Sequence, residues 1–75
     1  MGEIRVVVTF HTTTEAMAWE RLCKIEKLPG RLIPMPVQIS AQCGLAWLIT
    51  QQERQYLLER AAELRLEYDQ VVELE

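Results

Sequence analysis

Residues 3–15 read Glu3-Ile-Arg-Val-Val-Val-Thr-Phe-His-Thr-Thr-Thr-Glu15, and this stretch holds both a strand pattern and the start of a helix. Large apolar residues occupy every second position from residue 4 to residue 10, which is typical of a β-strand with one buried face. One face is predicted to carry Ile4, Val6, Val8 and Phe10, and the other Arg5, Val7 and Thr9. We therefore predict a strand over about residues 3–10.

A helix is predicted to follow this strand immediately. Thr12 and Glu15 form the S/T-x-x-E capping box, in which the hydroxyl and the carboxylate accept from free backbone N–H groups of the first turn. The helix should run to about Leu28, because Pro29-Gly30 disfavours its continuation. Its predicted buried stripe consists of Ala18, Leu22 and Ile25, widened by Trp19 and Cys23.

The next elements are two strands joined by a polar loop. The first spans residue 31 to about residue 35 and ends at Pro34-Met35-Pro36; because proline has no N–H to donate, we predict an edge strand. A loop covers residues 37–42. The following strand, residues 44–49, has Leu45, Trp47 and Ile49 on one face, against Gly44, Ala46 and Leu48 on the other.

A second helix and a last strand complete the chain. Thr50 and Glu53 repeat the capping box and predict a helix over about residues 51–66. Residues 67–74 are predicted to form the final strand. The predicted inward residues are Leu57, Leu58, Ala61 and Leu64 on the helix, and Tyr68, Val72 and Leu74 on the strand.

The order β-α-β-β-α-β predicts an α+β fold, the ferredoxin-like sandwich, over residues 1–75 as a single domain. In this fold one antiparallel four-stranded sheet carries both helices on one face. Right-handed crossovers then bring the end of the first strand, the start of the first helix and the loop at residues 37–42 to one end of the molecule. We therefore expect His11, Thr12, Thr13 and Cys43 to meet there.

Composition narrows the classes of partner. The 75 residues carry a net charge of −3, and eight Lys and Arg are scattered among eleven Asp and Glu, which argues against a nucleic-acid partner. Only Arg21, Lys24 and Lys27 cluster, at helical spacing, as on a solvated helix face. No apolar run approaches the roughly 20 residues of a membrane span, and no signal peptide precedes the first strand, so we expect a cytoplasmic protein.

Few residues are candidates for chemistry. A single histidine and the absence of a Cys-x-x-Cys pair argue against a metal site, and no cofactor motif occurs. Cys43 follows a polar loop and precedes Gly44, where a missing side chain allows a partner or a sulfur adduct to approach. A nearby helix start would stabilise its thiolate. Alternatively, Cys43 is a small buried residue at a strand start, as Cys23 is expected to be in the helix.

His11 and the adjacent threonines also have two interpretations each. His11 either holds a thiolate or moves a proton, or it is a surface residue at the strand–helix junction. Thr12 and Thr13 cap the helix, or the Thr13 hydroxyl lines an anion pocket. On the sheet, the apolar side with Val7 and Ala46 is consistent with self-association.

Three blocks of the sequence together resemble a known family. They are Thr9-Phe-His-Thr-Thr-Thr-Glu-Ala16, Arg31-Leu-Ile-Pro-Met-Pro36 and Ile39-Ser-Ala-Gln-Cys-Gly44. In this order they resemble the small domain DUF3343, labelled selenium/sulfur carrier-like because such domains occur fused to modules that resemble sulfur-relay proteins. The resemblance covers nearly the whole chain up to the second predicted helix.

This resemblance implies a function and a site. Cys43 takes the position of the family's cysteine and Gly44 that of its following glycine, while His11 and Thr12 match the block after the first strand. It implies a carrier, rather than a turnover enzyme, that holds a persulfide or selenosulfide on Cys43 between donor and acceptor proteins. Val37 stands where the family often has a basic residue, which removes one source of thiolate stabilisation. The alternative is a non-catalytic, self-associating interaction module with a structural cysteine.

Overall fold

The computed structural model describes residues 4–39 and 43–74, so the predicted strand start at Glu3 and the loop residues 40–42 lie outside the described residues. The elements in chain order are β1 (Arg5–Thr9), α1 (Thr13–Ile25), β2 (Arg31–Pro34), β3 (Leu45–Thr50), the 3-10 turn η1 (Gln51–Glu53), α2 (Arg54–Glu63) and β4 (Val71–Leu74). Within the described residues, neither helix has the length and apolar character needed to cross a membrane.

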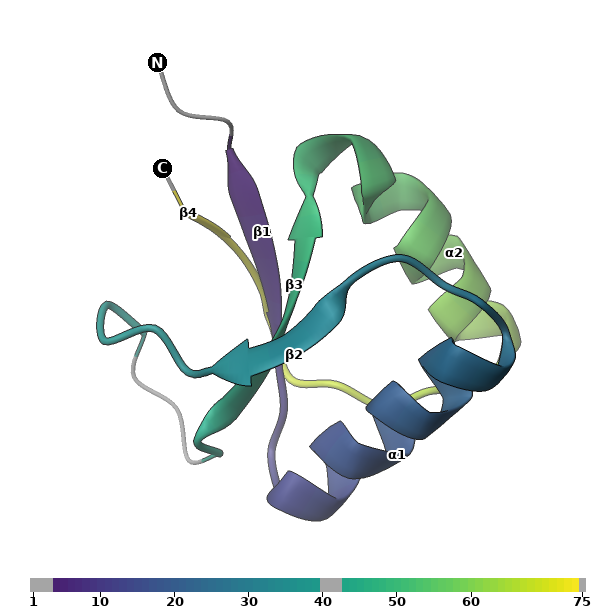
Figure 1. Ribbon diagram of the computed structural model, residues 1–75, viewed down its shortest axis with the longest axis horizontal. Helices are drawn as coiled ribbons and strands as arrows, with labels where there is room; N and C mark the ends of the chain where they lie inside the picture. The colour runs from purple at the N-terminus through teal and green to yellow at the C-terminus, as the bar shows by residue number, and fades with distance from the viewer. Residues whose placement is uncertain (1–3, 40–42, 75) are drawn as a thin grey trace.

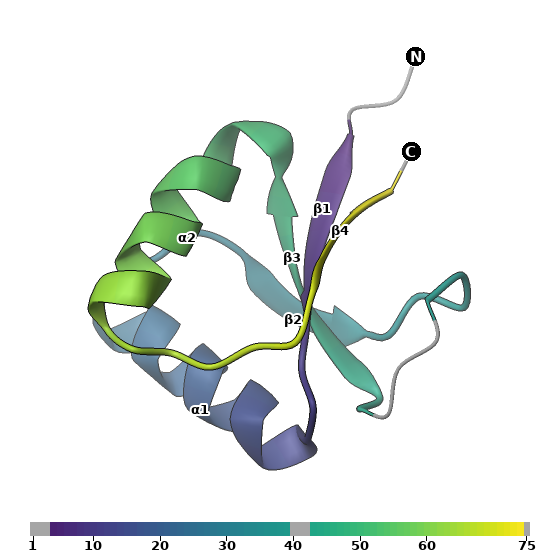
Figure 2. The same ribbon diagram turned by 180° about the vertical axis from the view of Figure 1, so that it is seen from behind.

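The four strands form one sheet in the order β2-β3-β1-β4, and each neighbouring pair is antiparallel. Both helices lie on the same side of this sheet (Figures 1 and 2). The predicted ferredoxin-like fold is therefore confirmed. The prediction that β2 lies at an edge is confirmed as well, and its Pro34 pairs only with Leu45 of β3.

The core lies between the sheet and the two helices. Trp19 of α1 is its largest fully buried side chain, and its ring contacts Phe10 and Tyr68 edge to face, with centroids 5.5 and 5.6 Å apart. Such pairs add about 1 kcal/mol each beyond the area they bury. The other buried members come from the sheet, both helices and two connecting segments: Val6, Val8, Trp47, Ile49, Ala16, Cys23, Leu57, Ala61, Leu28 and Cys43.

Both helices start near their predicted capping residues. Thr12 Oγ1 accepts from the N–H of Glu15 at 3.1 Å, but the Glu15 carboxylate accepts from the N–H of His11, at 2.8 Å, rather than from Thr12. At the second start, Glu53 accepts from the N–H of Thr50 at 3.0 Å. The predicted helix over residues 51–66 is shorter than expected, because η1 precedes α2 and α2 ends at Glu63.

The predicted end of α1 at Leu28 is wrong, because α1 ends at Ile25. Lys27 adopts a left-handed conformation with φ 57°. The N–H of Leu28 then donates to the Cys23 carbonyl at 2.8 Å, and that of Lys27 to the Lys24 carbonyl at 3.3 Å, which is a Schellman motif. The chain leaves the helix at a lysine, before the Pro29-Gly30 pair that was expected to stop it.

The predicted buried stripe of α1 is confirmed at Trp19 and Cys23 but wrong at Ala18 and Ile25. Ala16, Trp19 and Cys23 are buried, whereas Ala18 is exposed and Ile25 is 65% exposed. A helix turns about 100° per residue. With the Trp19 indole directed into the core, Ala18 and Ile25 lie about 100° or more away from it and face solvent.

The last strand is shorter than predicted and presents the opposite residues to the core. It begins at Val71. Val71 pairs with Val8 on the face that carries the helices, whereas Val72 pairs with Val7 on the opposite face. Val72 and Leu74 therefore do not face the helices, although Tyr68 does pack against the core as predicted. Backbone bonds between Asp69 and Thr9 hold this register, since the Asp69 N–H donates to the Thr9 carbonyl at 2.7 Å.

Candidate functional site

Cys43 lies two residues before β3, at the end of the sheet where β1 leads into α1. The register pairs Thr9, the last residue of β1, with Ala46, the second residue of β3. Cys43 belongs to the same buried cluster as Phe10, and its side chain is 3% exposed. The thiol is therefore covered, close to the strand–helix junction that precedes α1.

Two backbone features surround the Cys43 sulfur. The N–H of Leu45 donates to Sγ at 3.4 Å, and a donor in this position stabilises negative charge on a sulfur atom. Gly44 is exposed, and a Cβ built on it would have no described atom within 4 Å apart from its chain neighbours. Packing within the described chain therefore does not require a glycine at this position, which is next to Cys43 in the sequence.

The second thiol is in a different environment. Cys23 lies on the inner side of α1 and is 1% exposed. Burial raises the pKa of this thiol to about 11, so it stays protonated at neutral pH. Both cysteines are free. The prediction that Cys23 is a core residue is confirmed.

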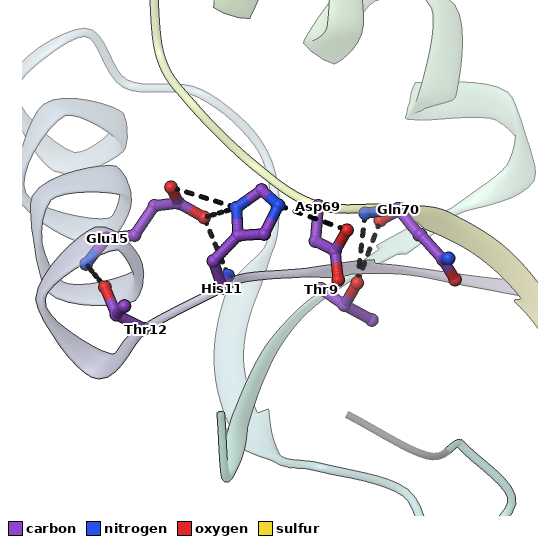
Figure 3. Close-up of polar contacts among 6 residues, drawn as sticks. All are labelled: Thr9, His11, Thr12, Glu15, Asp69 and Gln70. Carbon is purple, nitrogen blue, oxygen red and sulfur yellow. Dashed lines mark hydrogen bonds and ion pairs between the residues drawn. The ribbon is translucent and has the colours of Figure 1, made fainter. Parts of the chain in front are cut away.

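His11 is held between two carboxylates (Figure 3). Its Nδ1 lies 3.0 Å from Glu15 Oε1, and its Nε2 lies 3.3 Å from Asp69 Oδ1. Thr9 Oγ1 accepts from the Gln70 N–H at 3.0 Å beside this group. These contacts tie the start of α1 to the chain that precedes β4.

These contacts direct His11 toward β4, and β4 and β3 flank β1 on opposite sides. Within residues 4–39 and 43–74, no hydrogen bond or ion pair joins Cys43 to His11, Thr12 or Thr13. The Thr12 hydroxyl is used by the helix cap, and Thr13 is the exposed first residue of α1. The end of the sheet is shared as the topology predicted, but the side chains around Cys43 are those of the core.

Sequence reasoning did not find the two partners of His11. Glu15 had been interpreted only as a capping residue, although its spacing of four from His11 on a helix start was a usable signal. Asp69 had no signal, because its approach depends on the pairing of β4 with β1. Val37, in the loop between β2 and β3, is 99% exposed.

A hollow of about 330 Å³ lies beside the first turns of α1, and Cys43 does not line it. Thr12, Glu15, Trp19 and Arg65 are among its lining residues. The described residues contain no group of three or more His, Cys, Asp or Glu that could hold a metal ion. The thiol is thus surrounded by backbone and core side chains and lies apart from this hollow.

Comparison with protein families matches residues 5–73 to the family described as "Putative Se/S carrier protein-like". The matched range includes Cys43 and all four strands except Leu74, the last residue of β4. This match confirms the resemblance carried by the three sequence blocks. No curated protein and no solved structure matches the chain.

Proposed function

This chain belongs to the Se/S carrier protein-like family, and on that premise we propose that it carries sulfur or selenium on Cys43 between a donor and an acceptor protein. One observation supports Cys43 over Cys23 as the carrying atom. Cys43 Sγ receives a backbone N–H and stands next to an open glycine, whereas the pKa of Cys23 is raised to about 11 by burial.

Transfer proceeds by thiol–persulfide exchange. The Cys43 thiolate attacks the outer sulfur of a persulfide on the donor; a bond forms between Sγ and that sulfur, and the donor's sulfur–sulfur bond breaks. The donor cysteine leaves as a thiolate, so no oxidant or reductant is consumed. An acceptor thiolate later attacks the same outer atom and releases Cys43 as a thiolate. Selenium as the outer atom follows the same steps.

The surroundings of Cys43 have distinct roles in this proposal. The Leu45 N–H stabilises the thiolate before attack and after release. Gly44 provides the space through which the donor or acceptor approaches. The start of α1 contributes the partial positive charge of a helix N-terminus at the same end of the sheet. His11, Thr12 and Thr13 form the neighbouring surface that a partner contacts, rather than groups that activate the sulfur.

The burial of Cys43 has a consequence for transfer. A side chain that is 3% exposed reacts only when its segment is displaced or when a partner reaches it along Gly44. Small thiols in solution would then have little access to the bound chalcogen. A buried carrying atom therefore favours transfer within a protein–protein complex over release into solvent.

Persulfide loading tests the proposal. The chain is incubated with a cysteine desulfurase and cysteine, and its mass is measured without reduction. We expect the gain of one sulfur atom in the wild type and in Cys23→Ala, and no gain in Cys43→Ser. Equal loading of Cys43→Ser, with its fold verified by circular dichroism, would refute Cys43 as the carrying residue.

The low exposure of Cys43 also favours a second candidate, a non-catalytic interaction module in which this cysteine only packs. Thiol titration of the native protein at neutral pH separates the two functions. Labelling of Cys43 no faster than that of Cys23 supports the module, and faster labelling of Cys43 supports the carrier.

A further inference from the structure

Helix α1 has a second apolar side that no part of the chain described by the structure covers. Met17 is 51% exposed and Ile25 is 65% exposed, with exposed Ala18 and partly exposed Leu22 between them. We call these four residues the outer face of α1. They line a shallow hollow of about 730 Å³ whose described lining residues all belong to α1.

This outer face is more apolar than a solvated helix surface needs to be. A helix on a small domain ordinarily has one apolar stripe toward the core and polar residues elsewhere. In α1 the core stripe is Ala16, Trp19 and Cys23, so the outer face is additional. Its spacing is regular enough that sequence periodicity alone predicts its burial. Contiguous exposed apolar side chains of this kind mark contact sites.

The charges beside the outer face are mainly positive. Arg21, Lys24 and Lys27 are exposed. Of these three cations, only Lys24 has an ion-pair partner among the described residues, and that partner is Glu20 at 3.8 Å. Glu26, the other nearby carboxylate, pairs with Arg60 of α2 at 2.8 Å, and Arg60 also pairs with Glu63, whereas Arg21 and Lys27 have no ion-pair partner among the described residues. The surface is therefore locally positive on a chain whose net charge is −3.

We propose that the outer face of α1 binds an acidic, amphipathic helical segment of a partner protein. Apolar side chains of the segment cover Met17, Leu22 and Ile25, and its flanking carboxylates pair with the free cations. A second copy of this chain fits less well, because it would bring the same cations opposite one another. The proposal does not depend on the chemistry of Cys43.

Two synthetic peptides of about four helical turns test the proposal with the full chain. Both carry one leucine stripe; glutamates flank the stripe in the first peptide and lysines in the second. Fluorescence anisotropy of the labelled peptides measures their affinities. We expect the acidic peptide to bind about tenfold or more tightly than the basic one, and to weaken as ionic strength rises.

Matched variants localise the binding. Ile25→Ser and Arg21→Glu should each weaken the acidic peptide about tenfold. Their controls lie on other surfaces: Tyr56→Ser removes a side chain that is 52% exposed on α2, and Arg31→Glu inverts an exposed cation of β2. Both controls should leave the affinity unchanged within about twofold.

Three results would overturn the proposal. One is that neither peptide binds or that both bind equally, and another is that the control variants weaken binding as much as the outer-face variants. The third comes from sedimentation velocity of the chain alone: a dimer that Ile25→Ser converts to a monomer would assign the outer face to a second copy. Because the measurements do not involve sulfur loading, their outcome is separate from that of the carrier function.

Discussion

At the scale of single residues, Gly30 and Gly44 differ in the atoms that a side chain would meet if either glycine were replaced. Gly30 has φ 113°, and an added Cβ would collide with the Trp47 indole and lie 2.8 Å from Ile49 Cγ2. The same indole donates to the Pro29 carbonyl at 2.9 Å. Gly44 has open space at the equivalent point. The first glycine is required by the fold, while the second is not required by any described contact.

Alanine substitution should separate these two roles. We expect Gly30→Ala to lower the free energy of unfolding by about 2 to 4 kcal/mol, through backbone strain and displacement of Trp47. Gly44→Ala should change it by less than about 0.5 kcal/mol. Urea denaturation followed by tryptophan fluorescence measures both. If Gly44→Ala keeps its stability but loads sulfur more slowly, the glycine serves access to Cys43; a stability loss as large as that of Gly30→Ala would contradict this assignment.

The Cys23 thiol makes stability depend on pH in the alkaline range. Burial raises its pKa from 9.0 to about 11, so above pH 9 the unfolded chain releases a proton that the folded chain retains. The Cys23 contribution is complete below pH 9 and is lost as pH rises to about 11. The free energy of unfolding of the wild type should therefore fall by about 2 kcal/mol relative to Cys23→Ala over this range. Parallel pH profiles of the two proteins in urea titrations would show that the thiol is not buried as described.

At the scale of elements, a basic residue in a conformation that favours glycine lies two residues after the last residue of each helix. Lys27 and Arg65 each have φ 57°, and after each the next N–H donates back into the helix, that of Leu66 to the Ala61 carbonyl at 2.9 Å. Because a side chain in this conformation is strained, Lys27→Gly and Arg65→Gly should each raise the free energy of unfolding by about 0.5 to 1 kcal/mol. Lys24→Gly, inside α1, is the control and should lower it by about 1 kcal/mol. Thermal and urea unfolding measure the sign of the change in the free energy of unfolding for each variant. A lower stability of both Lys27→Gly and Arg65→Gly would refute backbone strain at these two positions.

The errors of sequence-based prediction also belong to the elements. Capping boxes located both helix starts, because those signals are local side-chain chemistry. The end of α1 was missed because Lys27, with no glycine signal, takes the left-handed position. The buried side of α1 was misassigned because its two apolar stripes have similar spacing, and only the volume of Trp19 decides between them. In β4 the prediction placed Val72 on the core face, but Val71 lies there. Because successive residues of a strand point to opposite faces, an error of one residue in the register is enough to exchange the two.

At the scale of the whole molecule, topology could be predicted and side-chain contacts could not. The order of elements was sufficient for the ferredoxin-like sheet, and with it for the location of Cys43 at the end of the sheet that precedes α1. Asp69, the second partner of His11, could not be predicted, because it approaches His11 only through the pairing of β4 with β1. The exposure of each thiol depends on the packing of the whole core. It is also the property on which the proposed transfer depends.

The two buried thiols should therefore report different opening events of the folded protein. Cys23 lies between α1 and the sheet, so its exposure requires separation of the core and should cost nearly the full free energy of unfolding. Cys43 stands just before β3 and outside the helices and strands, next to the exposed Gly44, so we expect its displacement to leave most of the core between α1 and the sheet in place. The rate of alkylation of Cys43 is measured in the folded Cys23→Ala variant, and that of Cys23 in the folded Cys43→Ser variant. Each rate is divided by the rate for the same thiol in the unfolded chain. We expect the resulting rate to be at least about tenfold higher for Cys43 than for Cys23. The rate at Cys43 should also rise more weakly with urea, because less surface is exposed. Equal opening free energies and equal urea slopes would mean that Cys43 reacts only on global unfolding, and a carrier that must unfold to exchange its sulfur would not be a workable mechanism.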